Sequence, residues 1–129
     1  MGEAKSHRDL TVWQKAMELA VETYRLSSKF PSSESYRLVS QITRAAASVP
    51  ANIAEGNARA TRKDYANFLC IAKGSLMEAE TFLMLAIRLK YVAEGDAARA
   101  LGLITEIGKM LTALRRRLKE NEELGNDRG

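Results

Sequence analysis

The sequence contains one cysteine, Cys70, and one histidine, His7. A single cysteine cannot form an internal disulfide and fits a reducing compartment. A single histidine excludes the Glu-x-x-His pairs of a di-iron bundle and leaves a zinc site short of ligands. We therefore expect no metal and no cofactor. The chain also lacks an 18-residue uncharged apolar run and an apolar signal-peptide core, so we expect a cytoplasmic protein with no membrane contact.

Groups for catalysis are equally scarce. No serine or cysteine nucleophile can be matched with a histidine base beyond His7, and no glycine-rich phosphate loop is present. Glu78 and Glu80 are two residues apart, so on a helix they project to different sides. That spacing is typical of solvated carboxylates. We expect no enzymatic activity.

The stretch from Leu38 to Gly56 has the clearest helical pattern. Its apolar residues fall in one arc, opposite a narrow polar stripe. Pro50 lies across the middle, where it removes the hydrogen bond to the Ala46 carbonyl at a cost of about 3 kcal/mol. Because the polar stripe continues on both sides, we predict one helix kinked at Pro50. The alternative is a helix that stops at Ser48, with Pro50 opening a second short one.

Capping and breaker residues delimit the other elements. The expected helices run from Asp9 or Thr11 to about Ser28, from Ser33 or Glu34 to Gly56, from Arg62 to about Leu89, and from Glu94 to about Asn121. Residues 1–8 are expected to be unstructured and residues 122–129 to fray. The short connections predict an all-α fold over residues 9–121, an antiparallel up-down-up-down four-helix bundle.

Several packing details can also be predicted. The first helix should present Trp13, Ala16, Met17, Ala20 and Tyr24 to the core, with Val12, Leu19 and Leu26 as a second apolar line. Gly56 has the position of a left-handed helix cap. Gly74 and Gly108, each costing about 1 kcal/mol relative to alanine in mid-helix, are interpreted as close helix crossings.

The third helix is apolar over more of its circumference than a surface helix needs. Cys70, Met77, Met84 and Tyr91 repeat every seven residues, apart from the line that should face the core. Either this helix lies at the middle of its own bundle, or it packs against another subunit. Since no helix of a four-helix bundle is central, we favour a homo-oligomer. The candidate contacts are this line together with Asn52 and Glu55.

Positive charge is concentrated between residues 36 and 75. This stretch contains six basic residues and two acidic ones; the basic residues are Arg37, Arg44, Arg59, Arg62, Lys63 and Lys73. Such a local excess indicates an anionic partner. Arg59, Arg62 and Lys63 flank a helix N-terminus and have no aromatic residues interleaved for base stacking, so nucleic acid would be bound through phosphates with little sequence preference.

A second basic group, Arg115, Arg116, Arg117 and Lys119, lies near the end of the fourth predicted helix. Cations at a helix C-terminus complement the helix dipole. We interpret this group in that way rather than as a binding site.

The motifs D-L-T-V-W-Q-K-A (9–16), S-V-P-A-N-I-A-E-G (48–56) and F-L-C-I-A-K-G-S-L-M-E-A-E (68–80) resemble those of the four-helix-bundle S23 proteins, whose genes lie in intervening sequences of bacterial 23S ribosomal RNA. The resemblance covers about residues 9–118. It implies a ring-like homopentamer without enzymatic activity. It also implies a fold similar to that of the accessory protein of diversity-generating retroelements, which engages nucleic acid and a reverse transcriptase.

Two functional hypotheses follow. The first is an oligomeric module that binds structured RNA or other nucleic acid through the six basic residues of 36–75. The second is a protein-assembly adaptor whose partner is a protein, such as a reverse transcriptase or a ribosome-associated factor. In the second hypothesis the mixed polar stripe is the contact surface, namely Arg37, Gln41, Arg44, Asn52 and Glu55.

Overall fold

The computed structural model describes residues 6–128, with side chains to residue 120. This part of the chain contains four α-helices and two short 3-10 turns, and no strand. The helices are α1 (Thr11–Ser27), α2 (Leu38–Asn57), α3 (Arg62–Arg88) and α4 (Glu94–Arg128), and the turns are η1 (His7–Asp9) and η2 (Ser32–Glu34). The predicted all-helical, four-helix class is confirmed. Most of the predicted unstructured start, residues 1–5, lies outside the described residues.

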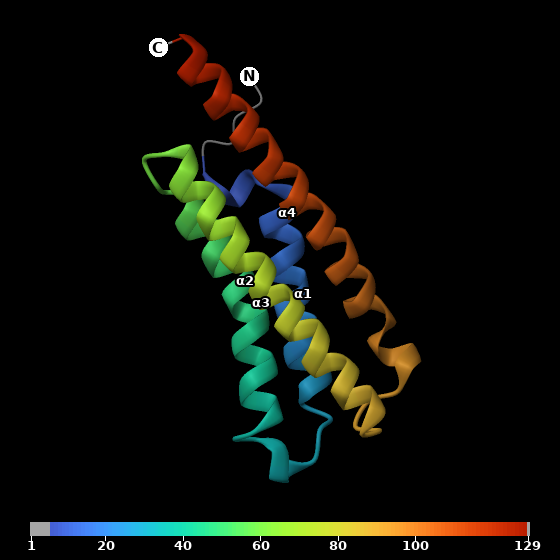
Figure 1. Ribbon diagram of the computed structural model, residues 1–129. Coiled ribbons are helices and arrows are strands. Elements are labelled where there is room, and N and C mark those ends of the chain that lie inside the picture. The colour runs from blue at the N-terminus through green and yellow to red at the C-terminus, as the bar shows by residue number, and fades with distance from the viewer. Residues whose placement is uncertain (1–5, 129) are drawn as a thin grey trace.

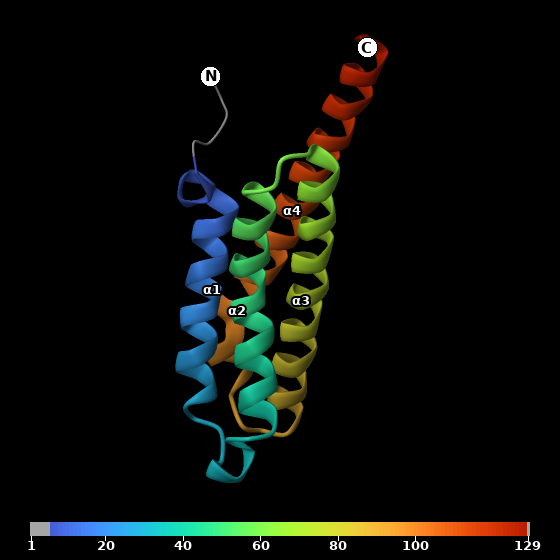
Figure 2. The same cartoon turned by 90° about the vertical axis from the view of Figure 1, so that its left-hand side faces the viewer.

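The four helices pack as a bundle in which contacts join α1 to α2, α2 to α3, α3 to α4, and α4 back to α1. Successive helices run in opposite directions along the bundle (Figure 1). The last part of α4 projects past the ends of the other three (Figure 2). This helix continues to Arg128, beyond the predicted end near Asn121.

The core consists of aliphatic side chains from all four helices. The largest fully buried ones are Leu19, Leu26, Ile42, Ile53, Leu69, Leu76, Ile104, Ile107, Leu111 and Val49. For α1 the predicted core face was wrong in part. Val12, Leu19 and Leu26 are buried, whereas Met17 and Tyr24 are exposed.

The face of α1 with Val12, Leu19 and Leu26 can be buried because the three polar side chains beside it find their hydrogen-bond partners within the helix. Thr23 Oγ1 donates to the Leu19 carbonyl (2.8 Å), and Ser27 Oγ donates to the Tyr24 carbonyl (3.1 Å). The buried carboxylate of Glu22 accepts two hydrogen bonds from Arg25 (2.9 and 2.7 Å). Polar groups with such partners are buried at little cost.

Helix α2 is continuous through Pro50, which is buried inside it. The alternative of a helix ending at Ser48 is therefore wrong, while a bend at Pro50 stays a prediction. The predicted start at Ser33 or Glu34 was early, because η2 precedes the helix and α2 begins at Leu38.

Gly56 lies within α2 and does not have the left-handed conformation of a cap. A Cβ added there would lie 2.8 Å from Phe68 Cβ and 3.2 Å from the Tyr65 carbonyl oxygen. Glycine is therefore required because α2 and α3 approach closely. Gly74 was wrongly interpreted as a crossing, since an added Cβ would meet nothing within 4 Å. At Gly108 an added Cβ would make only an ordinary contact, 3.6 Å from Leu76.

Thr61, followed by Asp64 in the spacing of a capping box, caps α3. Its side chain accepts a hydrogen bond from the Asp64 backbone amide (3.1 Å). At the other end of α3, the left-handed residue is Lys90, with φ of 64°. These two ends fix the length of α3, along which half of the candidate site residues lie.

Candidate nucleic-acid interface

The six basic residues predicted to bind nucleic acid do not form one patch. Arg37 stands at the start of α2 beside the buried Glu34, with Nε 3.4 Å from the carboxylate. Arg59, after the end of α2, pairs with Glu55 (2.8 Å), and its guanidinium lies 4.6 Å from the centre of the Phe68 ring. Both arginines therefore already have a carboxylate partner.

The turn between α2 and α3 nevertheless carries free positive charge. Arg62 and Lys63 are exposed in the first turn of α3, and neither forms an ion pair with the side chains described. Unpaired amide groups at a helix N-terminus add to the attraction for an anion. Asp64 in the same turn reduces it.

Arg44 lies apart, on the flank where α2 meets α3. It lines a shallow hollow of about 270 Å³ with Gln41, Ser48, Ser75 and Glu78. Ser48 and Ser75 share a hydrogen bond across the two helices (2.9 Å). Because the Glu78 carboxylate lies in the same hollow, this surface has mixed charge and little attraction for phosphate.

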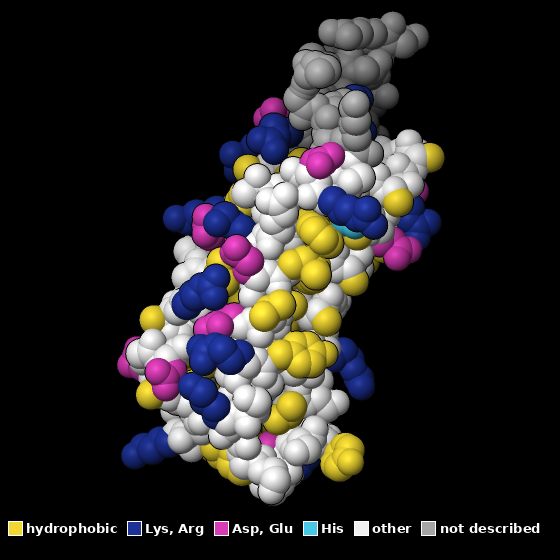
Figure 3. Space-filling model, turned by 180° about the vertical axis from the view of Figure 1, so that it is seen from behind, with side chains coloured by type: hydrophobic (Ala, Val, Ile, Leu, Met, Phe, Trp, Pro, Cys, Tyr) yellow, Lys and Arg dark blue, Asp and Glu magenta, His cyan; other side chains and the backbone are white. Residues whose placement is uncertain are grey.

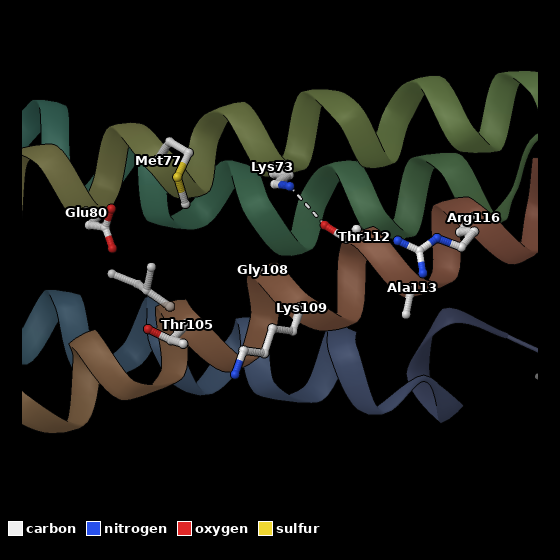
Figure 4. A pocket seen from close by; sticks show the side chains of 10 residues that line it. Lys73, Met77, Glu80, Thr105, Gly108, Lys109, Thr112, Ala113 and Arg116 are labelled. Carbon is white, nitrogen blue, oxygen red and sulfur yellow. Dashed lines mark hydrogen bonds between the residues drawn. The ribbon is translucent and has the colours of Figure 1, made fainter.

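Lys73 faces the other flank of α3, towards α4. Its Nζ donates to Thr112 Oγ1 (2.9 Å), a bond that holds the ammonium group across the groove between the two helices (Figure 4). A hollow of about 400 Å³ opens here, and its lining includes Met77, Lys109 and Arg116. The structure thus brings Lys73 together with basic residues of α4 rather than with the other five candidates.

The dipole interpretation of the basic group on α4 was wrong. Dipole stabilisation falls off within the last turn of a helix. Arg115, Arg116 and Arg117 lie about three turns before Arg128, where α4 ends. Their position on α4 therefore needs another explanation.

The predicted oligomer contacts stay predictions, and the structure shows their places. Met77 and Met84 are 39% and 45% exposed, and Cys70 is exposed on the same side of α3. Tyr91 is half-buried, with its ring 5.7 Å from that of Phe30. Burial raises the pKa of the Tyr91 hydroxyl, with a smaller effect from Glu34.

The other two predicted contacts are polar and lie on α2. Asn52 donates to the backbone carbonyl and hydroxyl oxygens of Ser48 (both 2.8 Å), and Glu55 pairs with Arg59. Each side chain therefore already has a partner, Asn52 on its own helix and Glu55 just after the end of α2.

Sequence reasoning missed an apolar surface on α1. Met17, Val21 and Tyr24 are 41%, 67% and 57% exposed, and hydrophobic side chains run along this face of the bundle (Figure 3). The i, i+4, i+7 spacing was visible in the sequence, but Met17 and Tyr24 were assigned to the core and Val21 to neither apolar line.

A buried carboxylate on α1 was missed as well. Glu22 lies at the boundary with α4, 3.8 Å from Arg99, and its hydrogen bonds from Arg25 lower its pKa. The signal available in the sequence was an arginine three residues after a glutamate on an apolar line. No group of three or more histidine, cysteine or acidic residues suited to a metal occurs in the part of the chain that is described.

The family model of the 23S rRNA-intervening sequence protein matches residues 8–113. The chain belongs to this family. The 23S rRNA-intervening sequence family includes a similar solved structure, a protein of unknown function from the S23 ribosomal protein family of Bacteroides thetaiotaomicron. It is 30% identical, with a TM-score of 0.76, over 81% of this chain and 98% of that one. None of the curated proteins compared with the chain matches it. Within the described residues, no helix is long and apolar enough to cross a bilayer.

Proposed function

We propose that this member of the 23S rRNA-intervening sequence family is a non-catalytic, cytoplasmic homo-oligomer that binds structured RNA through phosphate contacts. The observation that carries the proposal is the unpaired positive charge. Arg62, Lys63 and Lys73 form no ion pair with the side chains of residues 6–120, and nor do Lys109 and Arg116. Phosphates are the anions that such scattered, exposed cations attract without a shaped pocket.

Assembly would compensate for the small number of cations on each subunit. Of the 18 basic residues between residues 6 and 120, six form ion pairs, and the five named above are among the other twelve. Linking several copies of such a subunit raises avidity by orders of magnitude. The resemblance to the S23 proteins favours a pentamer. The subunit of that ring would be the antiparallel up-down-up-down bundle with its kinked second helix.

A salt titration tests RNA binding. Anisotropy of a fluorescein-labelled 23S rRNA stem-loop measures the dissociation constant between 50 and 200 mM KCl, a range in which phosphate contacts respond strongly. Each contact contributes roughly 0.7–0.9 to the slope of log affinity against log salt, so five contacts predict a loss of about 130- to 500-fold over this range. A flat response contradicts the proposal.

A second function, assembly with a partner protein, is favoured by a separate observation. Ile71, Met77, Met84, Leu85 and Leu89 are all exposed large apolar side chains on α3. Contiguous apolar patches on soluble proteins usually mark interaction sites. Affinity capture from a nuclease-treated lysate separates the two functions, because a partner bridged by RNA is lost and a directly bound protein is retained.

A further inference from the structure

The groove between α3 and α4 is a single surface with four basic residues on its α4 edge and Lys73 on its α3 edge. Three adjoining hollows of about 400, 340 and 370 Å³ share lining residues. Lys73 belongs to the first two, Thr112 to all three, and Arg116 to the first and third. We propose that this groove is a track for the phosphates of one RNA strand, an inference that rests on the RNA binding proposed above.

The charge of the groove matches a phosphate backbone. Five cations line it against two carboxylates, Glu80 and Glu120; the cations are Lys73, Lys109, Arg115, Arg116 and Lys119. This excess is larger than that at the turn between α2 and α3, where Arg59 is neutralised by Glu55 and Asp64 lies beside Arg62.

The cations are spread along the groove rather than clustered at one point. Lys109 and Arg116 are separated by two turns of α4, about 10 Å along the helix axis. A single small anion needs converging donors. Cations dispersed over such a length suit several consecutive phosphates of one chain.

The groove has the donors to hold these phosphates. Lys73 is fixed by its bond to Thr112, which leaves its charge without a carboxylate partner. Arg115 Nε is buried and has no hydrogen-bond partner among the described residues. Since the planar guanidinium group can donate two parallel hydrogen bonds to two oxygens of one phosphate, Arg115 is suited to this edge of the groove.

The lining also indicates which part of RNA is read. No aromatic ring lines any of the three hollows, so bases cannot stack there. The lining includes the small or flexible residues Cys70, Gly74 and Met77, of which Cys70 and Met77 are also candidate subunit contacts. Contacts limited to phosphates give binding with little dependence on base sequence.

A pair of matched double variants tests the track. Lys109→Gln with Arg116→Gln removes two exposed cations from the groove. Arg8→Gln with Arg88→Gln removes two exposed cations that line none of the three hollows, with the same change in net charge. The probe is the labelled 23S rRNA stem-loop at 0.1 M KCl. Losing two phosphate contacts predicts at least 40-fold weaker binding at about 0.1 M salt and a salt slope smaller by about 1.6. The control pair should weaken binding by less than about threefold, since it changes only the long-range field.

Circular dichroism and light scattering check that both variants keep the fold and the subunit number of the unmodified protein. If the two pairs weaken RNA binding equally, the track is wrong. In that case the proposed RNA binding still stands, provided that the unmodified protein shows the expected salt dependence. A groove variant that keeps its RNA affinity but forms smaller assemblies also overturns the track, and shows the groove to be a subunit contact. A flat salt response of the unmodified protein removes the proposed function itself.

Discussion

Replacing Gly56 by alanine tests the closest approach between two helices of the bundle. The residue lies near the end of α2, and the added Cβ would stand 2.8 Å from Phe68 Cβ and 3.0 Å from Tyr65 Cδ1. Phe68 Cβ is attached directly to the backbone of α3, so it cannot rotate away. The two helices must therefore move apart to admit the methyl group.

Two opposing effects set the size of the change. Alanine favours a helix interior over glycine by up to about 1 kcal/mol, and less near a helix end. Adding a methyl group to a well-packed contact costs about 1–3 kcal/mol. The steric cost wins, and we expect Gly56→Ala to lower the free energy of unfolding by about 1–2 kcal/mol. For a chain of this size that corresponds to a fall in Tm of about 4–6 °C.

Gly102→Ala is the matched control, because Gly102 is an exposed residue within α4 whose added Cβ would meet nothing within 4 Å. Only the propensity gain applies there, so we expect stabilisation by about 1 kcal/mol. Urea and thermal unfolding measure both variants at one subunit concentration, since assembly makes Tm depend on concentration. If Gly56→Ala matches or exceeds the stability of the unmodified protein while Gly102→Ala behaves as expected, the close approach of α2 and α3 is wrong.

Three further changes test other parts of the structure. Hydrogen bonds from Arg25 lower the pKa of Glu22, so its contribution to stability is present above the ordinary glutamate pKa and is lost as pH falls through the lowered value. Urea unfolding at pH 7 and pH 3 should therefore show less acid loss in Glu22→Gln, and an unchanged acid loss would contradict the pairing. Ser75→Ala removes the bond to Ser48 between α2 and α3 and should cost about 1 kcal/mol by the same assay; a neutral result would mean that the bond contributes nothing. Met84→Lys should reduce the subunit number in light scattering without altering the helical circular dichroism, and an unmodified protein that is already monomeric would refute the assembly.

The sequence was most informative where local chemistry determines structure. The Thr61 cap and the charged start of α4 were predictable because both depend on residues within one turn. The core face of α1 was not, because two apolar lines compete on that helix. The choice between them depends on Glu22 being paired with Arg25 and Arg99, and Arg99 lies on another helix. Periodicity alone does not contain that contact.

The location of the candidate site also depends on contacts between residues that are far apart in the sequence. A count of charges along the chain placed the binding surface between residues 36 and 75. It could not show that Glu34 and Glu55 neutralise Arg37 and Arg59, or that Lys73 faces α4. The basic group on α4 was assigned to the helix dipole instead of to a binding site, because the helix was expected to end nearby.

The bounds of α4 reverse the interpretation of its basic residues. With α4 extending to Arg128, the cations from Arg115 to Lys119 lie in mid-helix, where the dipole gives them no stabilisation. Neighbouring cations on one helix repel one another, so their clustering lowers helix stability unless an anion is bound. The three hollows that hold Arg115, Arg116 and Lys119 beside Lys73 supply a surface where an anion would relieve that repulsion. Phosphate binding and helix stability are then linked, and RNA should raise the Tm of the unmodified protein more than that of the Lys109→Gln, Arg116→Gln variant.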